Sequence, residues 1–216
     1  MTINPASRPE PSHGDDLFIR FANTLTYTRG RASDSIPDAD ALLGWLHTAG
    51  LISDRARAAE SGLLRRDPNE AGRRLERFWT LRRVLHEIAA EVDADGRPSP
   101  DRLRELNHIL RHGLHYHQLR LQPDGTRYAF SQVGDRLDQA RASIAASLAQ
   151  FLADDAPGRL RVCANSGCRE LFVDHSAAGR RIWCDMRTCG NQAKAARHRA
   201  RAREAPARVP VRSESV

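Results

Sequence analysis

Four cysteines constrain the C-terminal end of this chain more than any other feature. Cys163 and Cys168 enclose four residues, Cys184 and Cys189 enclose four more, and fifteen residues separate the two pairs. The chain has 4 cysteines among its 216 residues, so all of them lie in this stretch. Two tight chain reversals can each present two thiolates to one tetrahedral ion, with zinc–sulfur distances of about 2.3 Å. The spacing therefore predicts one structural zinc ion, Zn2+, held by these four sulfurs.

The residues between the two pairs support a zinc module. Residues 171–173 predict a short strand, 176–179 a turn and 181–183 a returning strand. Such a short hairpin cannot bury enough apolar surface to fold alone, and a structural zinc ion supplies about 10 kcal/mol or more. A redox or catalytic cysteine pair is the alternative. We disfavour it because four thiols fit one closed site, which leaves no open position for water.

An alanine-rich basic segment follows Cys189 and predicts a helix that begins at the last zinc ligand, as in treble-clef zinc folds. Cations at i and i+4 repel each other along a free helix, and bound phosphates would relieve that repulsion. Arg180 borders the same predicted surface. A solubilising basic end is the alternative. The residues expected to contact nucleic acid are Lys194, Arg197, Arg199, Arg201 and Arg203, together with Arg181 and Arg187.

Charge is distributed unevenly along the chain, whose formal net charge is +7. Residues 159–216 hold 13 Lys and Arg against 5 Asp and Glu, whereas the rest of the chain holds 21 against 22. The excess of positive charge therefore belongs to the C-terminal quarter. This asymmetry indicates a polyanionic partner for that part alone, with a solvated basic tail as the alternative.

Length and composition suit one core and a small second module, because 40% of the residues are hydrophobic. We expect a helical domain over 16–155, a turn-rich linker at 154–158 and the zinc module over 159–204. Residues 1–15 and 205–216 are predicted to be disordered. No signal peptide and no apolar run of about 20 residues are recognised, so we expect a cytoplasmic location and no membrane partner.

Apolar spacing predicts an α+β chain: a mostly helical N-terminal domain with a small antiparallel sheet, followed by a small treble-clef-like zinc module. Residues 17–25 are apolar enough for a strand. A Pro-Asp-Gly turn at 123–125 separates two short strands, at 119–121 and 127–130. The predicted helices of this domain cover residues 38–51, 54–64, 69–92, 101–111 and 134–152.

Histidines gather around the end of one predicted helix. Two of them stand at i and i+4, a metal-ligand spacing, but no Glu completes an H-E-x-x-H pattern. We therefore favour solvated or hydrogen-bonded histidines over a metalloenzyme. A nuclease at Asp174 and His175 would need a second metal, and its surroundings offer few ligands for one. The four histidines of the cluster are His108, His112, His115 and His117.

Three large aromatic side chains of the N-terminal domain, Trp45, Phe78 and Trp79, are most simply core residues. They would alternatively line a small-molecule pocket between helices. No constellation of residues in this domain identifies such a ligand.

The zinc module resembles the CGNR-type zinc finger. The residues that carry the resemblance are Arg161–Cys163, Cys168, Leu171–Asp174, Arg181–Met186 and Cys189–Asn191. Residues 17–153 resemble the ABATE domain, which usually precedes this finger in proteins described as stress-induced transcription regulators.

The chain departs from the family pattern at one position. The family's tetrapeptide ends in Arg, where this chain has Gln192. The departure leaves the zinc ligands intact but removes any phosphate or base contact attributed to that Arg. Lys194 and Arg197 remain available for such contacts.

The resemblance implies a transcriptional regulator that binds double-stranded DNA through the zinc module and senses a small molecule through the N-terminal domain. We expect no enzymatic activity. A zinc-stabilised module for protein or RNA interaction is the main alternative, and a small enzyme that uses a pocket of the N-terminal domain is another. A homodimer is compatible with each of these hypotheses.

Overall fold

The computed structural model describes residues 17–28, 30–154 and 157–204. Side chains are described for all of these except residues 117, 120, 122, 129–132, 157 and 202–204. The predicted disordered ends, 1–15 and 205–216, lie outside the described residues. No helix in the described ranges is both long enough and apolar enough to cross a membrane.

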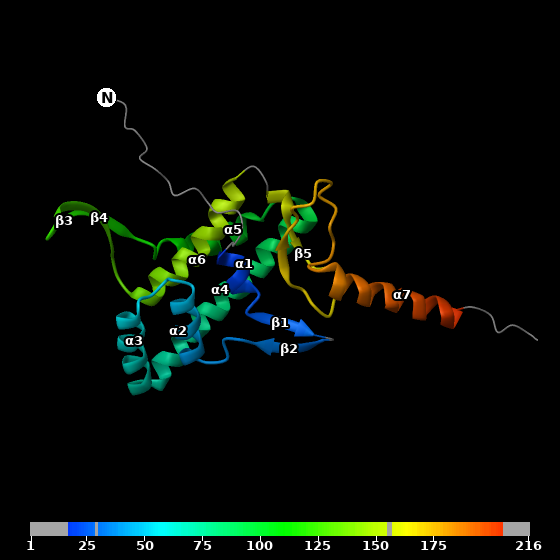
Figure 1. The fold of residues 1–216 in the computed structure, drawn as a ribbon, viewed down its shortest axis with the longest axis horizontal. Coiled ribbons are helices and arrows are strands. Elements are labelled where there is room, and N and C mark those ends of the chain that lie inside the picture. The colour runs from blue at the N-terminus through cyan, green and yellow to red at the C-terminus, as the bar shows by residue number, and fades with distance from the viewer. Residues whose placement is uncertain (1–16, 29, 155–156, 205–216) are drawn as a thin grey trace, which may run out of the picture.

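Helices dominate the described chain, and the α+β prediction is confirmed (Figure 1). The strands form three separate antiparallel pairs: β1 (Leu25–Thr28) with β2 (Arg31–Asp34), β3 (His115–Gln122) with β4 (Gly125–Gln132), and β5 (Leu160–Val162) with β6 (Leu171–Val173). Two short helical turns, η1 (Pro157–Arg159) and η2 (Met186–Gly190), flank the zinc module's strands. The α-helices are α1 (Leu17–Ala22), α2 (Ala39–Thr48), α3 (Asp54–Arg66), α4 (Pro68–Asp95), α5 (Pro100–Leu110), α6 (Arg136–Ala153) and α7 (Asn191–Glu204).

The long helix α4 organises the body of the molecule. Its start is set by Asp67, whose carboxylate accepts a hydrogen bond from the Glu70 N–H at 3.0 Å, and by Pro68 in the first turn. Gly96, with φ of 75°, ends it in the left-handed conformation that glycine adopts without strain. Helices α1, α2, α3, α5 and α6 and strand β5 all pack against α4. A single 28-residue helix therefore carries one side of most of the core.

The expected strand over residues 17–25 is wrong, because Leu17–Ala22 is the short helix α1 and only Leu25 belongs to a strand. Phe18, Phe21 and Ala22 are spaced at i, i+3 and i+4, and all three are buried. The helix lies against α4 and α6, with the rings of Phe18 and Phe151 5.4 Å apart. Packing against two larger helices on one face of α1 decides between helix and strand for this apolar run.

The expected returning strand at 181–183 is also wrong. Strand β6 pairs instead with β5, in the register Leu160↔Val173 and Val162↔Leu171. Leu160 and Leu171 are buried in the same core as the helices, whereas Ile182 is exposed and Trp183 packs on the smaller cysteine cluster.

Strands β5 and β6 are fixed to the helical domain by polar groups as well. The Asn23 side chain accepts from the Leu171 N–H and donates to the Leu171 carbonyl, each at 2.9 Å. Asp93, near the end of α4, accepts from the Val162 N–H at 3.1 Å and from the Arg161 guanidinium at 2.8 Å. The module's strands therefore share one core with the helical domain, while the boundary expected at 154–158 stays a prediction.

Two elements project from the body, the β3–β4 hairpin on one side and α7 on the other (Figure 1). The hairpin confirms the predicted strands at 119–121 and 127–130 and extends both, with Leu119 opposite Tyr128. Helix α7 packs against η2, the turn that carries the last cysteine.

Candidate zinc centre and nucleic-acid interface

The four cysteines converge on one point. Their sulfur atoms all lie within 4.8 Å of one another, and Cys184 Sγ is 3.6 Å from both Cys168 Sγ and Cys189 Sγ. A tetrahedron with zinc–sulfur bonds of 2.3 Å has edges of about 3.8 Å. Cys163, Cys168 and Cys189 are buried, and none of the four forms a disulfide. The donor set and its size fit one closed structural zinc site, as the spacing predicted.

The first pair of sulfurs is set by a tight turn after β5. Asn165 organises this turn, because its carbonyl accepts from the Cys168 N–H at 2.8 Å and its side chain accepts from the Gly167 N–H at 3.1 Å. Arg169, with φ of 63°, is the described non-glycine residue with a positive φ, and it reverses the chain next to Cys168. The turn thereby brings Cys168 back toward Cys163.

The second pair is set by η2. Asp185 caps this turn by accepting from the Arg187 N–H at 2.7 Å. The Met186 side chain, which is 55% exposed, lies over Gly190 in the close turn after Cys189. Helix α7 begins at Asn191, directly after this turn. The last ligand therefore lies at the base of α7, as the sequence indicated.

The thiols of the site differ in the direction of their pKa shifts. Burial raises the pKa of Cys168 to about 12 and raises that of Cys184 further above its usual value. At Cys189 burial acts in the same direction, but hydrogen bonding with Asn165 and the neighbouring thiols outweighs it and lowers the pKa. Thiolates are the zinc ligands, so metal binding must release protons from the raised pair.

Asp174 shapes the loop between β6 and Cys184, a role that sequence reasoning missed. Its buried carboxylate accepts from the Ser176 N–H at 2.9 Å and the Arg181 N–H at 2.8 Å. The hydrogen bonds from Ser176, followed by that from Arg181, lower the pKa of Asp174 to about 2. The signal in the sequence was an Asp two residues before a Ser, the pattern of an Asx turn.

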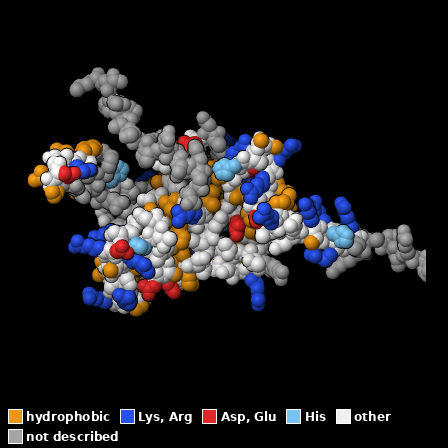
Figure 2. Space-filling view, in the orientation of Figure 1, with side chains coloured by type: hydrophobic (Ala, Val, Ile, Leu, Met, Phe, Trp, Pro, Cys, Tyr) orange, Lys and Arg blue, Asp and Glu red, His pale blue; other side chains and the backbone are white. Residues whose placement is uncertain are grey.

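The cations of α7 face solvent. Lys194, Arg197, Arg199 and Arg201 are exposed, and none of them makes an ion pair with a described residue. Figure 2 shows blue side chains crowded on α7, which stands clear of the body. The backbone of Arg203 belongs to α7, but its side chain lies outside the described ones. The structure therefore places four of the five predicted α7 contacts on one projecting helix, whose uncompensated cations are called the α7 ridge below. Lys194, Arg197 and Arg201 share one face of it, and Arg199 lies on another.

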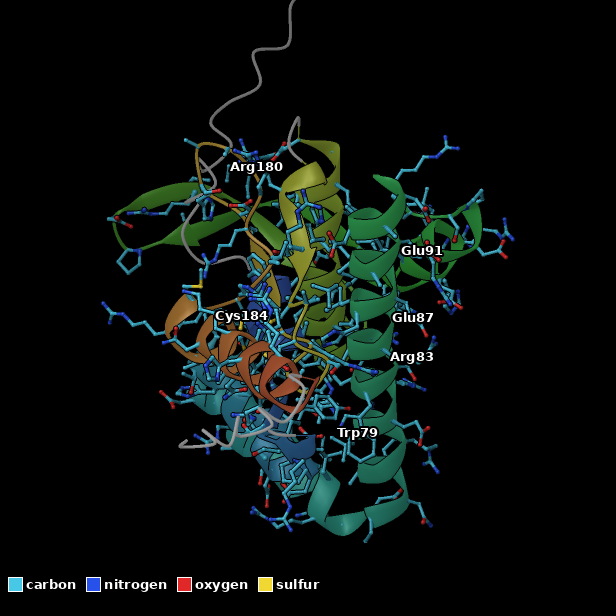
Figure 3. All side chains as sticks on the ribbon, turned by 90° about the vertical axis from the view of Figure 1, so that its right-hand side faces the viewer. Trp79, Arg83, Glu87, Glu91, Arg180 and Cys184 are labelled. Carbon is cyan, nitrogen blue, oxygen red and sulfur yellow. The ribbon has the colours of Figure 1, made fainter. Side chains whose placement is uncertain are left out.

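The three basic residues outside α7 are placed differently. Arg181 donates to the carbonyls of Trp183, at 2.8 Å, and of Cys184, and its guanidinium lies over the Phe172 ring at 5.0 Å from the centroid. Arg187 is exposed in η2, beside the base of α7. In Figure 3, Arg180 lies at the far end of the module from α7. Arg187 thus continues the α7 ridge, whereas Arg181 holds the module's own backbone.

Gln192, which replaces the family's Arg, has a structural partner. Its Oε1 accepts a hydrogen bond from Asn165 Nδ2 at 3.1 Å. Asn165 lies in the turn between the first two cysteines, so this bond links the first turn of α7 to the zinc site.

The histidines and aromatics of the helical domain take several roles. His108 and His112 lie edge to face, with ring centroids 5.8 Å apart. Phe78 is buried in the core, as predicted. Trp79 is 38% exposed, donates to the Ile36 carbonyl at 3.1 Å and lines a cleft of about 580 Å³ beside the first zinc turn. The four cysteines are the metal-ligand cluster found among the described residues, and the side chain of His117 lies outside them.

Comparison with known families places both parts of the chain. Residues 15–155 match the ABATE family, described as "Putative stress-induced transcription regulator". Residues 159–202 match the CGNR zinc finger. Among curated proteins, none matches the sequence. The first match covers well over half of the chain, and the second includes all four zinc ligands. The chain therefore belongs to the ABATE family and carries a CGNR zinc finger at the end of its helical domain.

Proposed function

We propose that the protein is a transcriptional regulator that binds double-stranded DNA through α7. The observation that carries the proposal is the exposed ridge of Lys194, Arg197, Arg199 and Arg201, none of which is paired with a described acidic residue. Exposed like charges destabilise a lone helix slightly. Bound phosphates neutralise them, and the relief of this repulsion favours binding.

The zinc site has a supporting role in this proposal. Helix α7 packs on η2, which the cysteines hold, and on little else, so the metal fixes where the helix begins and where it points. Presenting a rigid cationic helix reduces the entropy lost on binding. We assign no catalytic residue to the site, since four thiolates around zinc leave no position for water or substrate.

We propose that the helical domain supplies the regulatory part, as a sensor of a small molecule. Strands β5 and β6 share the core of that domain, and β5 leads directly into Cys163. A ligand that alters packing around α4 would therefore act on the base of the zinc module through Asp93 and its bonds to β5.

The DNA proposal is tested with the double variant Arg197→Ala, Arg201→Ala and a labelled duplex of random sequence. Each lost phosphate contact reduces the salt slope of log affinity by about 0.9, so we expect the slope to fall by about 2. Affinity at about 0.1 M salt should fall roughly tenfold or more.

A matched control removes the same charge elsewhere. Arg65 and Arg66 are exposed at the end of α3, on the opposite side of the body from α7 (Figure 1). Arg65→Ala with Arg66→Ala should change duplex affinity little. If the two double variants lose the same duplex affinity, the effect depends on net charge and not on α7, and the proposal is contradicted. Equal or tighter binding of single-stranded RNA would favour an RNA-binding module instead.

A further inference from the structure

A second cleft, of about 800 Å³, lies between α4, α5 and α6 inside the helical domain. Val84 and Ile109 form apolar parts of its wall. Arg83, also in its lining, stands on α4 in one column with Trp79, Glu87 and Glu91 (Figure 3). All of the lining comes from residues 76–141, so the cleft is separate from the zinc module.

One buried cation in this cleft is poorly partnered. The Arg141 side chain is 8% exposed, and its Nε is buried without a hydrogen-bond partner. Its closest acidic atom is Asp138 Oδ1, 3.3 Å from Nη2. A guanidinium has five N–H donors, and a buried donor left unmet is costly. An apolar side chain of similar volume would be less costly at this position, which makes Arg141 a candidate for a functional rather than a stabilising role.

The charges around Arg141 do not balance. Arg77 lies on the other side of Asp138, with Nη1 3.4 Å from Oδ2, so two guanidiniums share one carboxylate. Burial lowers the pKa of Arg141, and Arg77 lowers it further, while Asp138 acts in the opposite direction.

Most of the other charged groups of the lining have partners outside the cleft. Arg83 pairs with Glu87 and Arg104 with Asp101, and Glu105 is paired with Arg102. The lining's remaining charged side chains are Arg77, Arg141, Asp138 and Glu76, and Glu76 forms no ion pair with a described residue. Arg77 and Arg141 therefore share Asp138 as their acidic partner among the described residues.

We propose that this cleft binds a small carboxylic acid, whose carboxylate bridges Arg77 and Arg141 while its apolar body lies against Val84 and Ile109. Guanidiniums bind carboxylates through two parallel hydrogen bonds, which would include the buried Nε of Arg141. The inference specifies the ligand class of the proposed sensor role and so rests on that proposal.

The test is a titration of the full-length, zinc-loaded protein with benzoate, and in parallel with the uncharged isostere benzamide. The readout is the Nε–H signal of Arg141 in nitrogen-15 NMR spectra, assigned by its loss in Arg141→Met. We expect a saturable shift with benzoate, at a dissociation constant of about 1 mM or tighter, and none with benzamide.

Three variants make the test specific. Arg141→Met should lower benzoate affinity about tenfold or more, measured by calorimetry, without loss of thermal stability, because the buried charge is removed. Arg77→Met, at a half-exposed position, should also weaken binding. Asp138→Asn should strengthen binding several-fold, since it removes the competing carboxylate. Arg65→Met, on distant α3, serves as the control and should leave affinity unchanged.

The proposal is overturned if benzoate gives no saturable shift, if benzamide shifts the Arg141 signal equally, or if Arg77→Met and Asp138→Asn both leave affinity unchanged. No DNA is present in these measurements. A negative result therefore counts against the cleft alone, and a failure of the duplex experiment counts against α7 alone.

Discussion

The helical body and the zinc module are stabilised in different ways. The body buries many large apolar side chains completely, among them Phe18, Leu42, Leu81 and Ile88. The cluster that belongs to the zinc module alone consists of three buried cysteines and Phe172, with Trp183 and Cys184 at its margin. Burial can sustain the first region, whereas the second depends on its metal and on the anchorage of β5 and β6. The base of the solvated helix α7 therefore packs on the turn that carries the last zinc ligand and not on the apolar core.

The strongest test of this comparison is removal of the zinc site. Cys184→Ala should reduce bound zinc below about half an equivalent and unfold the turns around the site, because about 10 kcal/mol of binding free energy is lost. Amide exchange should become fast over α7 and η2 and stay slow over α4. Ser166→Ala, in the first zinc turn but not a ligand, should keep its zinc. Full zinc content in Cys184→Ala, measured by metal analysis, would contradict the four-sulfur site.

A smaller effect is expected from the strand that connects the two regions. Leu171 is buried in the common core, so Leu171→Ala should lower the free energy of unfolding of the helical body by about 2–5 kcal/mol, measured in urea with zinc retained. Leu63, which is 57% exposed, provides the control, and Leu63→Ala should have little effect. If the free energy of unfolding of the helical body is unchanged in Leu171→Ala, the module is a separate domain and does not share the body's core.

The smallest effect concerns an ion pair within the body. Arg82, itself buried, donates to both carboxylate oxygens of Asp34, at 2.7 and 2.6 Å. Asp34→Asn should lower the free energy of unfolding by about 2 kcal/mol at neutral pH, because the buried guanidinium loses its charged partner. The exposed pair of Arg104 and Asp101 is the control, and Asp101→Asn should cost less than about 1 kcal/mol.

The pH dependence of that effect has a definite sign. Burial raises the pKa of Asp34, but the hydrogen bonds from Arg82 and from the Ile36 N–H and the charge of Arg82 together outweigh it, so the pKa lies below its ordinary value of 3.8. The stabilisation is therefore present above pH 3.8 and is lost as pH falls through the lower folded value. The difference in free energy of unfolding between wild type and Asp34→Asn should become smaller as pH falls below about 4. Zinc loss at acid pH affects both proteins and cancels in this difference. If this difference stays constant down to pH 3, the charge of Asp34 does not contribute to the free energy of unfolding.

The zinc site was the part of the molecule best predicted from sequence. Four cysteines with equal gaps leave few arrangements, because the tetrahedral geometry of zinc restricts how the chain can turn between them. The long helices were also well predicted, since the apolar face of α4, from Leu75 to Val92, repeats at helical spacing. The basic character of α7 followed from composition alone.

The errors lie where tertiary contacts decide. The six residues of α1 have an apolar pattern compatible with helix or strand, and contact with α4 and α6 selects the helix. Strand β6 had a plausible partner in residues 181–183, but the buried Leu160 gives β5 the better contact. The contacts of Asn23 and Asp93 with β6 and β5 have no sequence signal, because the partners lie far away along the chain.

Local spacing and composition are sufficient to predict a helical body, a four-cysteine zinc site and a basic helix after it. Contacts in the folded chain are needed to show that β5 and β6 belong to the body's core, that α7 stands free in solvent, and that Arg77 and Arg141 share Asp138. These features join residues that are distant in sequence, and the free energy of burial that selects them is not encoded in any local pattern.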